Sequence, residues 1–372
     1  MSVELFAPLV AEICVHSLVK PGFSLRWTVI ANPKAGGFTI ITRWKKLYQV
    51  LKEKAEQAKS ANPRREDAEP SQKAGLLAAE NENILARSGV ITTQHPGHAS
   101  KIVEDLIQEA GGAPANALFL VICAGGDGTS LEALTALYAA PGEIREKFAV
   151  LRLPMGTGND GADAWELGDA LDFLIHPTRV DFARALSLST ATEGKGPFLA
   201  FNILSVGLDA FVTHMTNKMK GNLPGDSYKL WVDLAALFYN RIYKVGPMEI
   251  KSFDRDGKEE QSLRETALLL AVGASGRRTY GSRKKILPDD RNVCIVREMP
   301  LWRKLALKDL FTTGGHVDKK ETILFSAHRV EFWGWYPILA QMDGETALLQ
   351  PVDFPAAIEL TEPVIPVLKR LL

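Results

Sequence analysis

The sequence predicts an α/β protein of two domains: an N-terminal domain with a parallel sheet, and a second domain that is mostly antiparallel and β-sandwich-like. In the first half, short apolar segments alternate with glycine-containing turns and helical patterns, which is typical of a parallel sheet buried on both faces. After about residue 165, strand-like segments follow one another with few helices between them. The length of 372 residues also fits two domains of ordinary size.

The strands of the first sheet are predicted from four apolar segments. These are Trp27–Ala31, Val90–Thr93, Ala117–Cys123 and Ala149–Leu153. Helices are expected after the first three, over about residues 41–58, 99–109 and 130–139. We therefore expect the first domain over residues 24–164, with residues 355–372 returning to it.

The second domain, residues 165–354, is predicted from segments rich in β-branched and aromatic residues. Its expected strands are Phe198–Val206, Gly246–Phe253, Thr266–Val272, Val293–Arg297, Thr322–Trp333 and Ile338–Met342. Because sequential strands tend to be neighbours in space, we expect them to pair antiparallel.

The composition limits the classes of partner and compartment. A balance of 44 Lys and Arg against 44 Asp and Glu argues against a nucleic-acid partner, which requires a basic face. Three widely spaced cysteines form neither a disulfide framework nor a zinc motif and indicate a reducing compartment. The N-terminus does not resemble a signal peptide, and the longest apolar runs are too short to span a bilayer. We expect a cytoplasmic protein, soluble or peripheral to a membrane.

Three glycine-containing turns are candidates for an anion site: residues 32–37 (NPKAGG), 125–129 (GGDGT) and 154–160 (PMGTGND). In a parallel sheet such turns emerge together at the carboxyl edge. Glycines let the backbone approach a ligand closely, so that successive N–H groups can converge on a phosphate, and the helix after each turn adds its positive end. Tight turns also use glycine for structural reasons, but three at one edge favour a phosphate site.

Two of these turns carry an acid, Asp127 and Asp160, which would repel phosphate unless a divalent cation lay between them. Magnesium bound by one or two carboxylates, water and phosphate oxygens meets that requirement. Further polar side chains at the turns, which would also serve as helix caps, are Asn32, Thr129, Thr157 and Asn159.

The third turn also matches the dinucleotide-binding pattern G-x-G-x-x-G through Gly156, Gly158 and Gly161. The match lies on the fourth strand–helix unit rather than the first, and Pro154 separates the strand from the glycines. A nicotinamide oxidoreductase is therefore a distant alternative.

Taken together, the motifs resemble a family of lipid kinases. Residues 125–129 followed by Glu132 are similar to the nucleotide signature shared by diacylglycerol kinases, sphingosine kinases and NAD kinases. Other segments that resemble the lipid-kinase branch are Asn32-Pro33 with Gly36, Thr93 with Gly97-His98-Ala99, residues 154–160, Phe201-Asn202 with Gly207–Ala210, and Asp343-Gly344-Glu345. Their order holds from about Arg26 to the C-terminus, apart from an insertion, and indicates a catalytic domain of the bacterial diacylglycerol kinase type.

The resemblance implies an ATP-binding α/β domain, a β-sandwich-like lipid-substrate domain and an active site in the cleft between them. The γ-phosphoryl group of ATP would be transferred there to a lipid hydroxyl. Asp127 and Asp160 would organise the magnesium ion, and Glu345 would take the proton from the hydroxyl, with Asp127 as the alternative base. The residues that would contact ATP are Asn32, Pro33, Thr93, Gly125, Gly126, Asp127, Gly128, Thr129, Gly156, Thr157 and Asn159.

The sequence departs from the family pattern in two places. Asp289-Asp290-Arg291 stands where the family has D-D-G, a segment that holds a structural magnesium in some members, and Asp290 is the candidate ligand for it here. Gly161-Ala162 stands where bacterial members have an aromatic residue and alanine. Asp160 favours the diacylglycerol-kinase side of the family over the sphingosine-kinase side.

Three surface segments leave alternatives open. Residues 52–82 are polar and are interpreted as a solvated helical or disordered insertion, with a partner-binding arm as the alternative. Residues 277–285 carry five cations in nine residues, which suits anionic lipid headgroups, ATP phosphates or a solvated loop. Residues 301–311 form a cationic segment with an incomplete apolar stripe, which would pack on its own domain or lie at a bilayer interface.

The expected partners are ATP, a diacylglycerol-like or sphingoid-like lipid alcohol and a peripheral membrane surface, and a homodimer stays open. A soluble-substrate kinase of the NAD kinase superfamily shares the GGDGT motif and is the first alternative function. A lipid- or nucleotide-binding regulator without activity is the second, although the acids at positions 127, 160 and 345 are intact.

Overall fold

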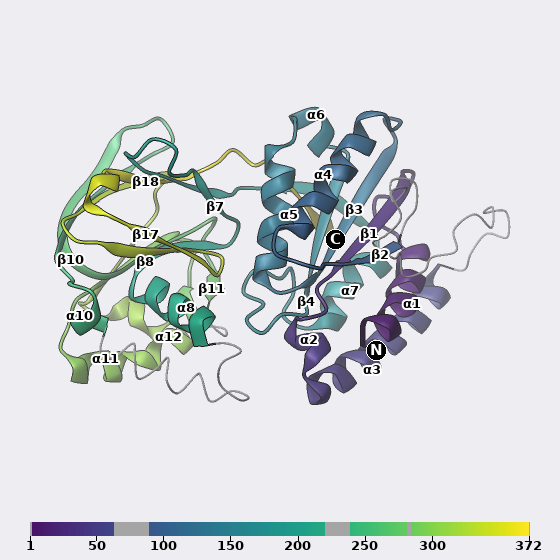
Figure 1. Ribbon diagram of the computed structural model, residues 1–372, viewed down its shortest axis with the longest axis horizontal. Helices are drawn as coiled ribbons and strands as arrows, with labels where there is room; N and C mark the ends of the chain where they lie inside the picture. The colour runs from purple at the N-terminus through teal and green to yellow at the C-terminus, as the bar shows by residue number, and fades with distance from the viewer. Residues whose placement is uncertain (1, 63–88, 220–238, 281–283, 372) are drawn as a thin grey trace. The chain divides into compact units, whose positions relative to one another are not determined.

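The computed structural model describes residues 2–62, 89–219, 239–280 and 284–371. The chain divides into two compact units, Met1–Ala183 with Pro363–Leu372, and Arg184–Glu362 (Figure 1). These bounds differ from the expected domains because residues 165–183 remain with the first sheet, whereas the strand β18 (Ala356–Leu360) pairs within the second unit.

The first unit is built on a six-stranded sheet with the order β2-β1-β3-β4-β19-β5. Its strands are β1 (Ser24–Ala31), β2 (Gly89–Thr92), β3 (Ala117–Gly125), β4 (Phe148–Pro154), β5 (Thr178–Ala183) and β19 (Ile365–Arg370). The strands β1 to β4 pair in parallel, and β19 runs parallel to β4 and antiparallel to β5. Every residue of β3 is buried, as the continuous apolar run predicts for a central parallel strand.

Helices cover both faces of this sheet (Figure 1). They are α1 (Ser2–Val15), α2 (Gly36–Thr39), α3 (Ile41–Ala61), α4 (His98–Gly111), α5 (Asp127–Ala139), α6 (Gly142–Arg145) and α7 (Leu167–Ile175). Buried side chains of α1, α3 and α7 share one hydrophobic cluster with alternate residues of β1 and β3, whereas α4 and α5 lie on the opposite face. The sequence interpretation missed α1, whose Phe6 packs edge-on against Phe38 with ring centroids 5.2 Å apart.

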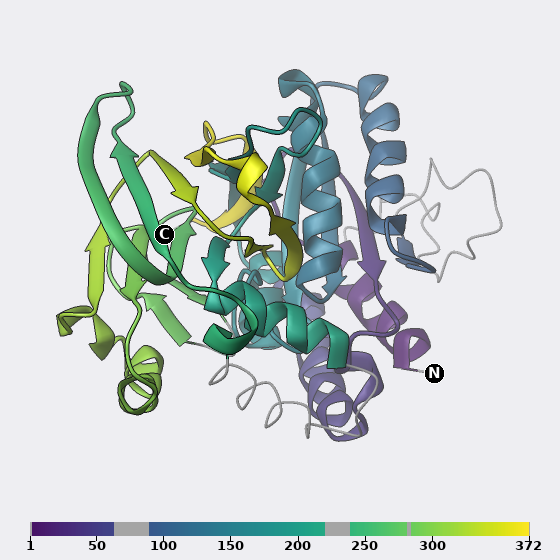
Figure 2. The same cartoon turned by 60° about the vertical axis from the view of Figure 1, so that its left-hand side comes forward.

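The second unit contains an eleven-stranded antiparallel sheet. Besides β18, its strands are β6 (Leu186–Ser189), β7 (Phe198–Ala200), β8 (Ile203–Gly207), β9 (Pro247–Phe253), β10 (Glu259–Gly273), β13 (Val293–Arg297), β14 (Thr322–Phe325), β15 (Arg329–Gly334), β16 (Ile338–Met342) and β17 (Glu345–Leu349). The long strand β10 pairs with β9 in its first part and with β8 and β13 in its second. Buried apolar side chains of β8, β9, β10, β13, β15, β16 and β18 share one cluster, which agrees with the expected β-sandwich-like domain. Figure 2 shows the strands of this unit from a second direction.

Two segments expected as single strands are interrupted. The segment 198–206 is divided at Phe201-Asn202, because the backbone N–H groups there bind the Asp343 carboxylate instead of a neighbouring strand. The segment 322–333 is divided at residues 326–328, where the Ala327 N–H donates to Asn292 Oδ1. In both places a side-chain oxygen from a distant residue accepts the hydrogen bond that a neighbouring strand would otherwise accept. The apolar pattern of the segment itself does not reveal such a partner.

The remaining elements of the second unit are peripheral. They are α8 (Leu208–Met219), α10 (Tyr239–Ile242), β11 (Arg278–Tyr280), β12 (Lys284–Leu287), α11 (Leu301–Lys308), α12 (Leu310–Thr313) and the 3₁₀ helices Gly315–Asp318 and Pro351–Asp353. In α11, Leu307 is buried in the unit, whereas Leu301, Trp302 and Leu305 are exposed. The interpretation that residues 301–311 pack on their own domain is therefore confirmed for Leu307, and contact with a bilayer stays a prediction.

Some of the expected surface segments fall outside the described residues. Residues 52–61 of the polar insertion continue α3, and its residues 63–82 are not described. Residues 281–283 of the basic segment are likewise not described. Within the described ranges, none of the helices combines the length and apolar character needed to cross a bilayer.

Candidate active site

The predicted turns of the first unit lie at one edge of its sheet. The strands β1, β2, β3 and β4 are parallel, so the segments after their carboxyl ends emerge on the same side. The turn 125–129 leads directly into α5, for which Gly126 is the N-cap and Asp127 the first residue. Thr93, after β2, is also at this edge and donates its N–H to Ala31 O at 2.9 Å.

The first and third turns touch each other through small residues. Gly37 donates its N–H to Met155 O at 2.8 Å. A Cβ placed on Gly36 would lie 3.0 Å from Thr157 Oγ1, which is closer than ordinary van der Waals contact. These glycines are thus required for close approach, and the contact fixes Thr157 beside the first turn.

The second and third turns meet backbone to backbone. A Cβ placed on Gly156 would overlap Gly126 Cα, and one placed on Gly125 would lie 2.5 Å from Thr129 Oγ1. Asn32 connects the first turn to the second, because its Nδ2 donates to Thr129 Oγ1 at 3.2 Å. Three segments far apart in the sequence therefore form one continuous polar rim.

The two acids of the rim face the same small space. Gly161 N–H donates to Asp127 Oδ1 at 2.9 Å, which leaves Oδ2 directed toward Gly158. A Cβ placed on Gly158 would lie 3.1 Å from Asp127 Oδ2 and 3.3 Å from Asp160 Oδ2. The missing side chain of Gly158 thus creates a cradle between the carboxylates.

This donor set fits magnesium. Two carboxylates with room for water and phosphate oxygens match the way that this hard cation is held in phosphotransferases. Among the described residues, no group of three or more His, Cys, Asp or Glu side chains could hold a metal by itself. The remaining ligands of a cation at this cradle would therefore have to come from a substrate and from water.

Asn159, in the same turn, carries a second group that could bind a ligand. Its φ of 61° is left-handed, a conformation that asparagine tolerates better than most residues. Its Nδ2 donates to Pro154 O at 3.1 Å, while the buried Oδ1 has no hydrogen-bond partner among the described residues. A buried unpartnered acceptor is costly, so this oxygen is suited to a donor group or a cation supplied by a ligand.

The sequence interpretation missed two side-chain interactions that hold the rim. The Asp163 carboxylate accepts from Arg152 N–H at 2.7 Å and from the Arg152 guanidinium at 2.6 Å, so the chain folds back immediately after the third turn. Glu132, noted only as part of a motif, accepts from the N–H groups of Gly97 and Ala99 at the start of α4. Asp163 is thus bound by a charged side chain and Glu132 by backbone N–H groups, and local patterns present both acids as ordinary surface residues.

Glu345 lies in the second unit, on the hairpin turn between β16 and β17. Asp343 and Gly344 form the two-residue loop with φ values of 46° and 102°, the geometry for which an Asp-Gly pair is well suited. The Asp343 carboxylate accepts from the N–H groups of Asn202 at 3.1 Å and Ile203 at 3.0 Å. The Glu345 side chain is exposed on this anchored turn.

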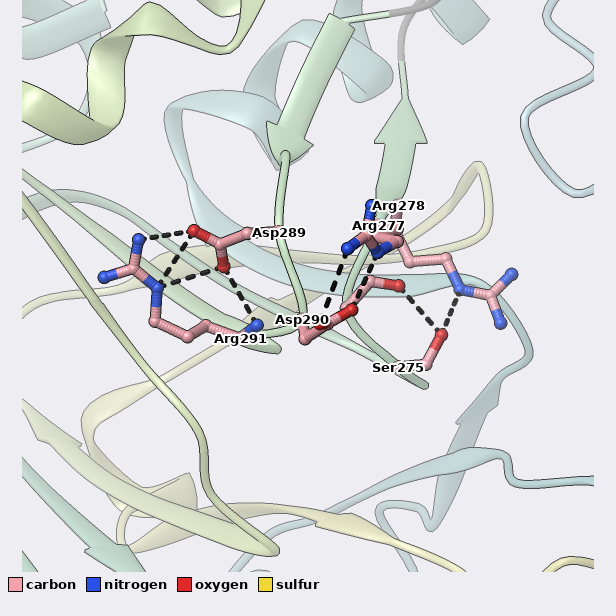
Figure 3. A network of polar contacts seen from close by, with 7 residues as sticks. Ser275, Arg277, Arg278, Asp289, Asp290 and Arg291 are labelled. Atoms are coloured by element: carbon pink, nitrogen blue, oxygen red, sulfur yellow. Dashed lines mark hydrogen bonds and ion pairs between the residues drawn. The ribbon is translucent and has the colours of Figure 1, made fainter.

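Asp290, the candidate ligand of a structural magnesium, also lies in the second unit. Figure 3 shows its carboxylate beside the Arg277 guanidinium, with Arg277 Nε donating to Asp290 Oδ1 at 2.7 Å. This hydrogen bond lowers the pKa of Asp290. The neighbouring Asp289 is bound in the same way by Arg291 (Figure 3). A cation at Asp290 would therefore have to compete with an arginine, and the site stays a prediction.

A further acid, Asp209 at the start of α8, is buried, and this burial raises its pKa to about 6. An acid whose folded pKa is raised contributes stability that is present below its ordinary pKa and lost as the pH rises through the folded value. We expect the free energy of unfolding of the wild type to fall, relative to Asp209→Asn, by about 2 kcal/mol between pH 4.5 and 7.5. Urea unfolding of both proteins across this range measures the difference, and parallel pH curves would contradict it.

Comparisons with known proteins agree with the motifs. Residues 71–189 match the family model described as "Diacylglycerol kinase catalytic domain", a range that contains Thr93 and both acidic turns. The "Probable lipid kinase YegS-like" of Enterobacter sp. (strain 638) is 25% identical over 277 residues, which are 70% of this chain and 82% of that protein. These matches confirm the resemblance to lipid kinases of the diacylglycerol kinase type. They also support the assignment of a kinase activity to this chain.

Solved structures show the same fold. Two structures named as a "putative diacylglycerol kinase from Bacillus anthracis str. Sterne" superpose with TM-scores of 0.56 and 0.55 at 18% identity. Each superposition covers 94% of this chain, and the shares of the two matched chains are 98% and 96%. The likeness therefore extends over both units, and at this identity it is evidence of fold alone.

Proposed function

We propose that the protein is an ATP- and magnesium-dependent lipid kinase that phosphorylates the hydroxyl of diacylglycerol or a related long-chain alcohol. The observation that carries the proposal is the cradle at Gly158, which the carboxylates of Asp127 and Asp160 share where the second and third turns meet at one sheet edge. Anion-binding turns alone would suit many nucleotides, but the paired acids suit a metal-bound triphosphate. The similarity to lipid kinases supports a lipid acceptor.

The proposed roles follow from the chemistry of each group. Magnesium, when bound, supplies charge neutralisation for the phosphate oxygens. Asp127 and Asp160 would hold it, the backbone of residues 125–129 would bind phosphate with the positive end of α5, and Asn32, Thr93, Thr157 and Asn159 would position the nucleotide. Glu345 would accept the proton of the lipid hydroxyl, and Asp127 is the alternative base.

A membrane surface is the proposed source of the acceptor. The helix α11 exposes Leu301, Trp302 and Leu305, and a tryptophan among leucines is suited to a bilayer interface. Of the two acceptor classes, Asp160 favours a diacylglycerol-like lipid over a sphingoid-like one.

A panel of acceptors tests the function. Purified full-length protein is incubated with labelled ATP, magnesium and one acceptor at a time: diacylglycerol, monoacylglycerol or sphingosine in mixed micelles, or soluble NAD. We expect label in a lipid phosphate, identified by mass, and none when EDTA replaces magnesium. Label on NAD would favour the soluble-substrate alternative, and ATP binding without turnover of any acceptor would favour a regulator.

A further inference from the structure

The turn that carries Glu345 is supported by a buried polar network from neighbouring elements. Gln341, the residue before Met342 at the end of β16, is buried, and its Oε1 accepts from Gly344 N–H at 3.1 Å. Its Nε2 donates in the opposite direction, to Ser205 Oγ at 3.1 Å and to Asp209 Oδ2 at 3.2 Å. One amide thus joins the exposed turn to the start of α8.

Asp209 Oδ2 and, at 3.4 Å, the carbonyl oxygen of Ile203 both accept from Nε2 of this amide, and the carboxylate is the charged acceptor of the two. Its Oδ2 accepts from Ser205 Oγ at 2.5 Å as well as from Gln341, and the Tyr280 hydroxyl also hydrogen-bonds the carboxylate. An ionised carboxylate only accepts hydrogen bonds, so it requires the NH₂ group of Gln341 on its side. The carbonyl oxygen of Gln341 is then left for Gly344 N–H.

The helix α8 supports the turn at two more points. Asn217 Nδ2 donates to Gly344 O at 2.8 Å, and His214 Nδ1 lies 3.3 Å from Thr346 Oγ1. Both polar groups of the Gly344 backbone are therefore bound by side chains, one from β16 and one from α8. The side chain of Glu345 is exposed, whereas the residue before it, Gly344, and the residue after it, Thr346, both contact side chains of neighbouring elements.

Stability alone is a weak explanation for this arrangement. Burying an acid and an amide costs desolvation, and an apolar pair of similar size would fill the same space without that cost. A two-residue Asp-Gly hairpin also forms without such support. What the network adds is a fixed backbone position for Glu345, which a proton acceptor needs in order to reach a hydroxyl.

We propose that Gln341, oriented by Asp209, is a positioning residue that fixes the Asp343–Glu345 turn for proton abstraction by Glu345. This inference rests on the proposed function, because it assumes that Glu345 acts on the acceptor. It does not require Gln341 or Asp209 to touch a substrate.

The first test uses hydrogen exchange, which does not depend on activity. Gln341→Met keeps the size of the side chain but removes both hydrogen-bonding groups, and amide exchange in the peptide covering residues 343–346 should become about tenfold faster. The matched control is Asn292→Leu, which removes another buried amide of this unit, bound to Gly273 O and Ala327. That variant should leave exchange at the turn at the wild-type rate. Unchanged exchange in Gln341→Met would overturn the proposal.

The second test asks whether the support acts through Glu345. In the full chain, Gln341→Met should lower kcat on the lipid acceptor about tenfold with the KM for ATP unchanged. In the Glu345→Gln background the same change should cost less than about twofold, because a base that has been removed needs no positioning. An equal loss of kcat in both backgrounds would overturn the proposal.

The proposed function and this inference can fail separately. If the wild type phosphorylates no acceptor, the proposed function fails, and the catalytic part of the inference fails with it. The exchange experiment still decides by itself whether Gln341 holds the turn.

Discussion

Asp127→Asn is expected to lower kcat for lipid phosphorylation by about a hundred- to a thousandfold, with the fold intact. Asparagine has nearly the same shape as aspartate, and its carbonyl oxygen can still accept from Gly161 N–H, the contact that joins the second and third turns. The negative charge beside the Gly158 cradle is lost, however, so a magnesium ion there would be held by Asp160 without its partner. Steady-state kinetics at several magnesium concentrations measure both kcat and the apparent affinity for the metal.

The control for this variant is Asp105→Asn. Asp105 lies on α4 in the same unit, where its exposed carboxylate pairs with Lys101 at 2.8 Å. Exposed pairs of this kind contribute little to stability, so the control changes the same charge without touching the rim. If Asp127→Asn kept more than a tenth of the wild-type kcat at saturating magnesium, while the control behaved as wild type, the central role of Asp127 would be refuted.

The elements that the sequence predicted best are those whose pattern is set by burial. Val293–Arg297 and Ile338–Met342 have the predicted bounds, because the core of the sandwich determines their pattern. The helix α8 was missed because it follows β8 directly, and the break occurs at Gly207, whose φ of 95° suits glycine alone. The helix α1 was missed because its apolar residues and Pro8 do not form a clear amphipathic pattern.

The position of the candidate site was predictable for a topological reason. Once the first four strands are assigned to one parallel sheet, the turns after them must emerge at the same edge. Asp127 and Asp160 lie on two of these turns, so both acids are expected at that edge. The interactions that hold the site were not predictable in this way. Arg152 with Asp163, and Gln341 with Asp209, pair across turns or between elements, and each residue taken alone is an ordinary charged or polar residue. Only the folded chain shows which partner each one has.

Gly158→Ala is expected to reduce the affinity for the divalent cation by about a hundredfold without changing any charge. The added methyl group would occupy the space between Asp127 Oδ2 and Asp160 Oδ2, at 3.1 and 3.3 Å from them. The φ of Gly158 is not among the left-handed values, so alanine can adopt the same backbone conformation and the protein should fold. The affinity is measured by titrating the protein with Mn²⁺ in the presence of a non-hydrolysable ATP analogue. The decrease of the signal of free Mn²⁺ reports how much of the ion is bound.

The matched control is Gly111→Ala, near the end of α4, where an added Cβ meets nothing within 4 Å. This variant should bind Mn²⁺ as the wild type does, with a stability equal to or slightly above it, because alanine favours a helix more than glycine does. Gly158→Ala changes only the volume of the cradle, and Asp127→Asn changes only its charge. If a cation lies between the two carboxylates, both substitutions must reduce the affinity for it. Wild-type Mn²⁺ affinity in Gly158→Ala would mean that the carboxylates do not share an ion, even if Asp127→Asn were inactive.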